Sequence, residues 1–177
     1  MKKTLITLLC CTLFITATHA QVKKYENKAG HFSVGFPGEV TPQTEDVPSE
    51  AGNLKMNMFM CTPDEGKDAN GLYAVDYTDY PSDLISSDSN KALRERFFTG
   101  AVNGFAKNVS GEIVNSSSMM YKIYPGVKAK VSMEGGFMYV QAYLVKSRLY
   151  LLMVGCDTDK DGNAGIEKFF KSFELLK

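Results

Sequence analysis

The fold is decided by an unbroken apolar run, Leu149-Tyr150-Leu151-Leu152-Met153-Val154. In a β-strand, successive side chains point to opposite faces of the sheet, so this run is apolar on both faces. Such a strand is stable only where other elements cover both of its faces. We therefore expect residues 149–155 to form a central strand of a sheet that has packing layers on both sides.

Alternating, turn-bounded segments on the N-terminal side of this run predict neighbouring strands. Between residues 127 and 134 every second side chain is apolar, namely Val127, Ala129, Val131 and Met133. This period of two is typical of a half-buried strand. Gly135-Gly136 and Ser147-Arg148 are two-residue connections that favour tight hairpins. The last three predicted strands therefore form an antiparallel meander over residues 127–134, 137–146 and 149–155.

Shorter strand-like segments lie earlier in the chain. They are residues 22–26, 31–36, 54–60, 73–78, 112–115 and 119–124. The polar stretch 39–53 contains Pro42, Pro48 and Gly52, and we expect it to be an exposed connection. The run Ser116-Ser117-Ser118 is predicted to be a loop by its composition. Both expectations rest on the preference of proline, glycine and serine for turns.

Two segments have the spacing of amphipathic helices. In the first, an apolar stripe consists of Leu93, Phe97, Phe98, Ala101, Val102 and Phe105. In the second, it consists of Ile166, Phe169, Phe170 and Phe173. Ser87, Asp88 and Ser89 are candidate N-caps of the first helix. Because helices that are segregated from an antiparallel sheet must pack on it, the fold class is predicted to be α+β.

Residues 1–20 have the layout of a secretory signal peptide. Lys2 and Lys3 are followed by an apolar stretch from Leu5 to Ile15 and by the polar end Thr18-His19-Ala20. The apolar stretch is shorter than the ~20 residues of a membrane-spanning helix. We therefore predict that residues 21–177 form a single mature domain, periplasmic or secreted, with no membrane span after signal cleavage.

Charge and cysteine content restrict the classes of partner. The chain has 20 basic and 20 acidic residues, and removal of Lys2 and Lys3 with the leader leaves 18 against 20, a net charge of −2. This balance attracts neither nucleic acid nor an anionic membrane. Cys61 and Cys156 remain after cleavage, and an oxidising compartment permits a disulfide between them. Two buried free thiols are the alternative interpretation.

Three segments of the sequence resemble those of a known family. They are Phe32-Ser33-Val34-Gly35-Phe36-Pro37-Gly38, Arg148-Leu149-Tyr150-Leu151-Leu152 and Phe169-Phe170-Lys171-Ser172-Phe173. With this order of elements, the chain from about residue 25 to 175 resembles the PsbP/DcrB-like superfamily. The resemblance implies an α/β/α sandwich around an antiparallel sheet, often exported, that serves as an accessory or binding module. It supplies no residue-level site for this sequence.

One loop has the residue types of a calcium site. Oxygen-bearing side chains alternate before the turn residue Gly162, at Asp157, Asp159, Asp161 and Asn163. Such spacing can converge oxygen ligands on Ca²⁺. The twelfth loop position is Lys168 where a bidentate glutamate belongs, so calcium binding through this loop is predicted to be weak. In the alternative interpretation the loop is a strand-to-helix turn, and Asp161 or Asn163 caps the last helix.

The sequence contains few residues that could form a catalytic site. His31 is the sole histidine after the leader, and no G-x-S-x-G segment occurs. The sequence therefore favours an exported, non-catalytic accessory module without a resident cofactor, which binds an unidentified protein or small molecule. A weak calcium-binding protein that uses the Asp157–Asp161 loop is the first alternative. An envelope enzyme whose site is unrecognised, with His31 as its base, is the second.

Overall fold

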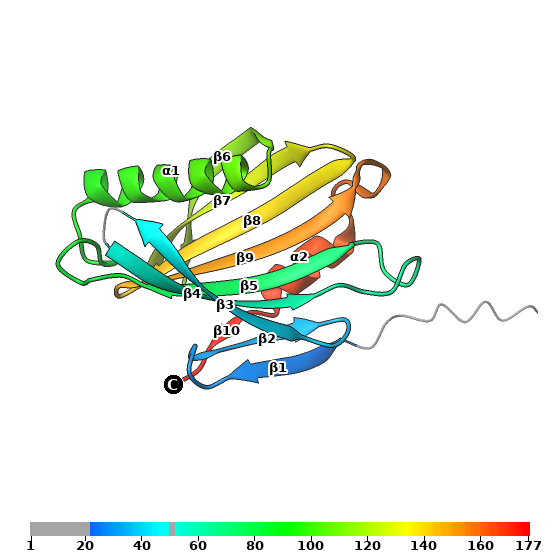
Figure 1. The fold of residues 1–177 in the computed structure, drawn as a ribbon, viewed down its shortest axis with the longest axis horizontal. Coiled ribbons are helices and arrows are strands. Elements are labelled where there is room, and N and C mark those ends of the chain that lie inside the picture. The colour runs from blue at the N-terminus through cyan, green and yellow to red at the C-terminus, as the bar shows by residue number, and fades with distance from the viewer. Residues whose placement is uncertain (1–21, 50–51) are drawn as a thin grey trace, which may run out of the picture.

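The computed structural model describes residues 22–49 and 52–177, and the predicted leader, residues 1–20, lies outside them. Figure 1 shows the elements in chain order. They are β1 (Lys23–Asn27), β2 (Phe32–Phe36), β3 (Thr41–Ser49), β4 (Gly52–Cys61), β5 (Leu72–Asp79), α1 (Lys91–Asn108), β6 (Glu112–Tyr121), β7 (Tyr124–Met133), β8 (Gly136–Val145), β9 (Arg148–Asp157), a 3₁₀ turn (Thr158–Lys160), α2 (Ala164–Lys171) and β10 (Glu174–Leu175). No described helix has both the length and the apolar character needed to cross a membrane.

The strands form two antiparallel sheets. The large sheet has the order β3-β4-β5-β9-β8-β7-β6, and the small one has the order β1-β2-β10. The run 149–154 lies in β9, the fourth of seven strands, so its predicted central position is confirmed. The predicted meander is also confirmed, and β6 extends it to four consecutive strands. The architecture is α+β, as the sequence predicts.

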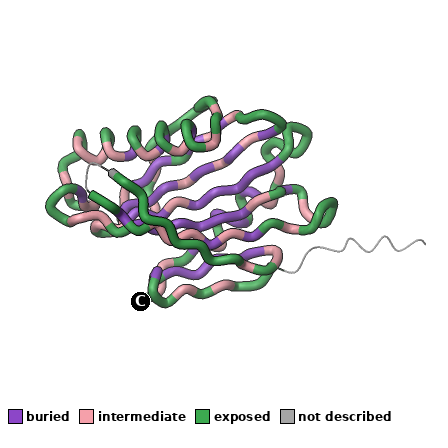
Figure 2. Tube along the Cα trace, in the orientation of Figure 1, coloured by how far each residue is buried: buried purple, intermediate pink, exposed green. Residues whose placement is uncertain are grey.

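The two faces of the large sheet are covered by different layers. On one face, Leu149 of β9 packs in an apolar cluster with Phe98 and Val102 of α1, and Met153 packs in a second cluster with Ala106 of α1. On the other face, the alternate residues Tyr150, Leu152 and Val154 pack beneath β2 and α2. Figure 2 shows the resulting pattern, with buried residues concentrated in the inner strands and exposed ones along the outer strands.

An aromatic core joins the small sheet to the large one. Phe32 of β2 is fully buried, and its ring lies 5.6 Å from Phe59, 6.2 Å from Tyr150 and 5.9 Å from Phe173 between centroids. Each such side chain contributes about 1.5–3 kcal/mol through burial. Phe36 adds a contact with Phe169 of α2 at 5.5 Å. The N-terminal hairpin and the C-terminal helix are therefore one packing layer.

The expected connection over residues 39–53 is instead a strand for most of its length. β3 pairs with β4 from Thr41 opposite Met60 to Ser49 opposite Gly52. β3 is an edge strand, where a proline whose nitrogen faces away from the sheet costs no ladder hydrogen bond. Pro42 and Pro48 are six residues apart, an even number, so both nitrogens face the same side of the strand. The prolines therefore mark an edge of the sheet and not a loop.

The run Ser116-Ser117-Ser118, predicted to be a loop, lies in the middle of β6. The turn into β7 is Lys122-Ile123, where Lys122 adopts a φ of 54°. A β-bulge interrupts the β6–β7 pairing between Ile113 and Asn115. Serine is tolerated here because β6 is exposed, so its side chains need no apolar neighbours.

The ends of both helices differ from expectation. α1 begins after Asn90, whose Oδ1 accepts a hydrogen bond from the Leu93 backbone nitrogen at 3.0 Å. None of Ser87, Asp88 and Ser89 is therefore the N-cap. α2 ends at Lys171, and the chain continues through buried Phe173 into β10, which pairs with β2. A two-residue strand has no periodicity that sequence reasoning could detect.

Candidate functional site

The predicted calcium ligands lie between the end of β9 and the start of α2. Asp157 ends β9, and Asp159 is within the 3₁₀ turn, where its carboxylate pairs with Lys160 at 2.7 Å. The Asp161 carboxylate accepts a hydrogen bond from Lys130 Nζ at 2.6 Å and another from the Tyr139 hydroxyl. These two bonds, with that from Lys130 the stronger, hold the pKa of Asp161 below its usual value.

Asn163 is the N-cap of α2. Its Oδ1 accepts a hydrogen bond from the Gly165 nitrogen at 2.9 Å, which confirms the capping interpretation of this loop. The carboxylates of Asp159 and Asp161 are likewise bound to neighbouring side chains. Residues 22–49 and 52–177 contain no group of three or more His, Cys, Asp or Glu that is placed to hold a metal ion. No three carboxylates of this loop come together in the described residues, and calcium binding through Asp157, Asp159, Asp161 and Asn163 stays a prediction.

Cys61 and Cys156 are both buried and free. Cys61 ends β4 and Cys156 lies in β9, with β5 between those strands. Two strand spacings amount to about 10 Å, which exceeds the ~7 Å limit for the Cα atoms of a disulfide. The disulfide alternative is therefore wrong for this fold, and the buried-thiol alternative holds. Burial raises the pKa of both thiols, so neither has the thiolate character of a nucleophile.

A buried polar network fixes the loop between β4 and β5 to the start of α2. The Tyr73 hydroxyl donates to Asp68 Oδ1 at 2.7 Å, and Asn70 Nδ2 donates to the Tyr73 hydroxyl at 2.7 Å. Asn163 Nδ2 donates to Asn70 Oδ1 at 2.7 Å. The pKa of Tyr73 is raised, mainly because the hydroxyl is buried and next because it is hydrogen-bonded to Asp68. The network therefore joins the loop before β5 to the first turn of α2.

Two adjoining hollows follow this junction, and they share Pro37 and Lys67. One, of about 400 Å³, is lined by Val22, Gly35, Pro37, Lys67, Asp68, Ala69, Tyr73, Asn163, Ala164, Gly165, Lys168 and Phe169. The other, of about 690 Å³, is lined by Pro37, Gly38, Glu39, Thr41, Gln43, Met60, Thr62, Pro63, Asp64 and Lys67. We call the two together the junction cleft. Its walls are apolar in places and carry charges of both signs, which suits a ligand of mixed polarity.

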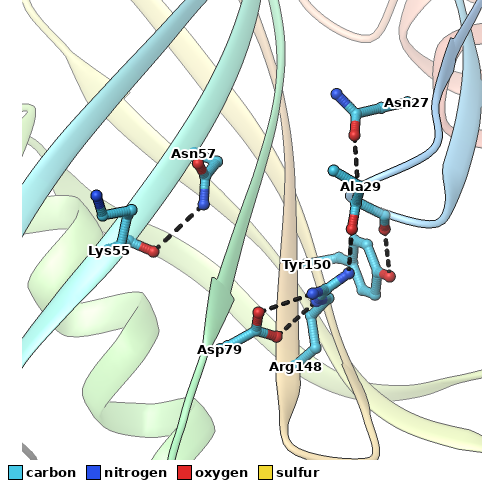
Figure 3. A network of polar contacts seen from close by, with 8 residues as sticks. Asn27, Ala29, Lys55, Asn57, Asp79, Arg148 and Tyr150 are labelled. Atoms are coloured by element: carbon cyan, nitrogen blue, oxygen red, sulfur yellow. Dashed lines mark hydrogen bonds and ion pairs between the residues drawn. The ribbon is translucent and has the colours of Figure 1, made fainter.

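A second polar cluster lies near the turn between β8 and β9. Figure 3 shows Arg148 between Asp79 and Ala29. The guanidinium binds both oxygens of Asp79 at 2.6 and 2.7 Å, donates to the Ala29 carbonyl at 3.0 Å and lies over the Tyr77 ring, 4.5 Å from its centroid. The Tyr150 hydroxyl donates to the Gly30 carbonyl at 2.7 Å. Arg148 therefore fastens the β1–β2 turn to the large sheet.

His31 lies beside this cluster, on a hollow of about 450 Å³ that Asp79 and Ser147 also line. These residue types could form a hydrolytic triad, but the geometry does not connect them. Asp79 is held by Arg148, and among the described residues no hydrogen bond joins His31 to Ser147 or Asp79. A working triad needs a base that is bonded to both its nucleophile and its orienting acid.

Sequence reasoning missed one unusual carboxyl group. Asp76 of β5 is only 6% exposed, and its Oδ1 has no hydrogen-bond partner among the described residues. Burial raises the pKa of Asp76 to about 7, although the Asn57 backbone and the Thr78 side chain oppose the shift. The available signal was an aspartate within an otherwise buried strand. Because this carboxyl group is buried within the sheet, we treat it as a determinant of stability.

Comparison with known proteins supports the fold and does not extend to function. No protein-family model and no curated protein sequence matches this chain. Among solved structures, the fold is that of a PsbP-like α+β domain. The cyanobacterial PsbP of Synechocystis sp. PCC 6803 (CyanoP) is similar over 91% of this chain and 96% of its own, with a TM-score of 0.57 and 13% sequence identity.

Proposed function

We propose that this protein is an exported, non-catalytic accessory module that holds an extended segment of a partner protein in the junction cleft. The observation that carries the proposal is the pair of adjoining hollows along a hydrogen-bonded junction. Export is supported by the signal-like residues 1–20. A non-catalytic role is supported by the buried thiols and by the engagement of Asp79 with Arg148.

The shape and chemistry of the cleft favour a peptide segment as its occupant. A site for a small molecule usually encloses most of the ligand, whereas these two hollows are partly open to solvent and lie next to each other, sharing Pro37 and Lys67. Val22 and Pro37 supply apolar surface for side chains of the segment. Lys67, paired with Asp64, and Asp68, bonded to Tyr73, line the cleft and offer charges of both signs, which would set the orientation of the segment.

Site-specific photo-crosslinking in cells tests the proposal. A photoreactive residue at Ala69, which is exposed and lines the cleft, should give one adduct of defined mass. The same residue at Thr99, exposed on α1 on the opposite side of the large sheet, is the matched control and should give none. Adding Ala164→Trp, at an exposed position that lines the cleft, should abolish the Ala69 adduct.

Four outcomes would count against the proposal. Equal adducts from both positions would show nonspecific contact, and an adduct that Ala164→Trp leaves unchanged would exclude the cleft. A hydrolytic activity of the purified protein that His31→Ala abolishes would favour the enzyme alternative. Recovery of the chain in the cytoplasmic fraction, with residues 1–20 retained, would refute export.

A further inference from the structure

The large sheet has two edges, and only one of them is protected against pairing. The outer strand β3 carries Pro42 and Pro48, with Glu45 and Asp46 between them. Prolines and charges are the usual means by which a sheet edge avoids pairing with another chain. The opposite edge strand, β6, has neither a proline nor a charged residue from 113 to 121.

The hairpin geometry identifies the backbone groups that β6 presents outward. Tyr121 and Tyr124 flank a two-residue turn, so they form a hydrogen-bonded pair, and bonded and non-bonded pairs alternate from there along the ladder. Residues 116, 118 and 120 therefore direct their N–H and C=O groups away from β7. Pro125, which has no N–H, lies opposite Met120 and fits this assignment.

We propose that β6 pairs with β6 of a second copy of this chain, antiparallel, about a two-fold axis at Ser118. In this register, Ser118 forms a hydrogen-bonded pair with Ser118 of the second copy, and Ser116 forms one with Met120. Every outward N–H and C=O group of the regular segment 115–121 then has a hydrogen-bond partner. On the other face, Ser117 lies opposite Met119. Each methionine therefore meets a serine, and no two large side chains collide.

Charge and exposed apolar surface favour the same occupant. Glu112 begins β6 and Lys122 directly follows it, so an antiparallel second copy brings the acidic end of one strand beside the basic end of the other. Large apolar side chains at this edge are exposed, with Val114 at 53%, Met120 at 59% and Ile123 at 79%. Pairing would cover them, and the same surface on both copies gives a closed two-fold dimer.

Charge exchange at the axis tests the proposal by sedimentation equilibrium of the mature domain. Ser118→Lys and Ser118→Asp each place two like charges opposite each other, and each should weaken the dimer by at least about fivefold. An equimolar mixture of the two variants should dimerise again, because unlike charges then meet. Thr44→Lys, on the exposed edge strand β3, is the matched control and should leave the dimer unchanged. Circular dichroism and melting temperature verify that each variant folds.

Cysteine substitution tests the register. Ser118→Cys should give a covalent dimer on mild oxidation, because paired residues of antiparallel strands lie within disulfide distance. Ser116→Cys should not, because its own copy lies four residues away along the strand. A monomeric wild type at millimolar concentration, a dimer that is insensitive to Ser118→Lys, or equal crosslinking of both cysteine variants would overturn the proposal. If this edge instead bound a different protein, the equimolar mixture of Ser118→Lys and Ser118→Asp would not regain the dimer. That result would also overturn the proposal.

Discussion

Replacing Asp76 with asparagine should stabilise the domain strongly at pH 8 and much less at pH 5. Asp76 lies in β5, where Met58 and Leu151 flank it on the neighbouring strands. Its carboxyl group is 6% exposed, and Oδ1 has no partner among the described residues. Ionisation of this group therefore places an incompletely solvated charge within the sheet, and asparagine removes that charge at nearly constant shape.

The magnitude follows from proton linkage. Burial raises the pKa of Asp76 from 3.8 to about 7 in the folded state. Between these two values only the folded chain keeps the proton, so the free energy of unfolding falls as pH rises and becomes level above about pH 7. At 1.36 kcal/mol per pKa unit, the full effect is about 4 kcal/mol at pH 8. Of this, about 3 kcal/mol is lost between pH 5 and pH 8.

The assay is urea unfolding of wild type and Asp76→Asn at pH 5 and pH 8. The difference between the two pH values cancels any fixed packing cost of the amide, so it isolates the charge. It should be about 3 kcal/mol in favour of the variant at pH 8, or about 6–12 °C in melting temperature for a domain of this size. Asp83→Asn, which alters an exposed carboxylate, is the matched control. A variant whose advantage is the same at both pH values would refute the reasoning.

Three further outcomes are expected. The melting temperature of the mature domain should be the same in calcium and in chelator, because no three carboxylates of the loop come together in the described residues. Asp159→Ala should not alter this result. A calcium-dependent rise in melting temperature that is lost in Asp159→Ala would support the calcium site instead. Arg148→Ala should lower the free energy of unfolding by about 2 kcal/mol in urea titrations, because the charged hydrogen bonds to Asp79 are lost; a change below the error of the titration would show that the contact is dispensable. Cys61 and Cys156 should react with a thiol reagent only after denaturation, and rapid labelling of the native protein would contradict their burial.

The sequence predicted those parts of the fold whose residues pack against the core. The apolar run 149–154 and the stripe of α1 keep their period because the partner layer demands it. β3 and the centre of β6 were missed because they are edge strands, whose exposed faces place little demand on residue type. Their prolines and serines satisfy backbone geometry and carry no signal of burial.

The candidate sites were harder to predict than the fold. The spacing from Asp157 to Asn163 correctly located a strand-to-helix turn. Composition, however, cannot show that Lys130 and Tyr139, from other strands, donate hydrogen bonds to the Asp161 carboxylate. The junction cleft has residues from β2, the loop 62–71 and α2. These segments are far apart in sequence, so their meeting is a property of the topology.

The position of β10 makes completion of the small sheet depend on residues that are distant from it along the chain. Glu174 pairs with Ser33, so β2 receives one of its two neighbours only from residues 174–175. Closing a loop of about 140 residues is slow, because its entropy is lost before the contact forms. A nascent chain that has not yet reached residue 174, and equally a chain cut before that residue, therefore leaves one margin of β2 unpaired.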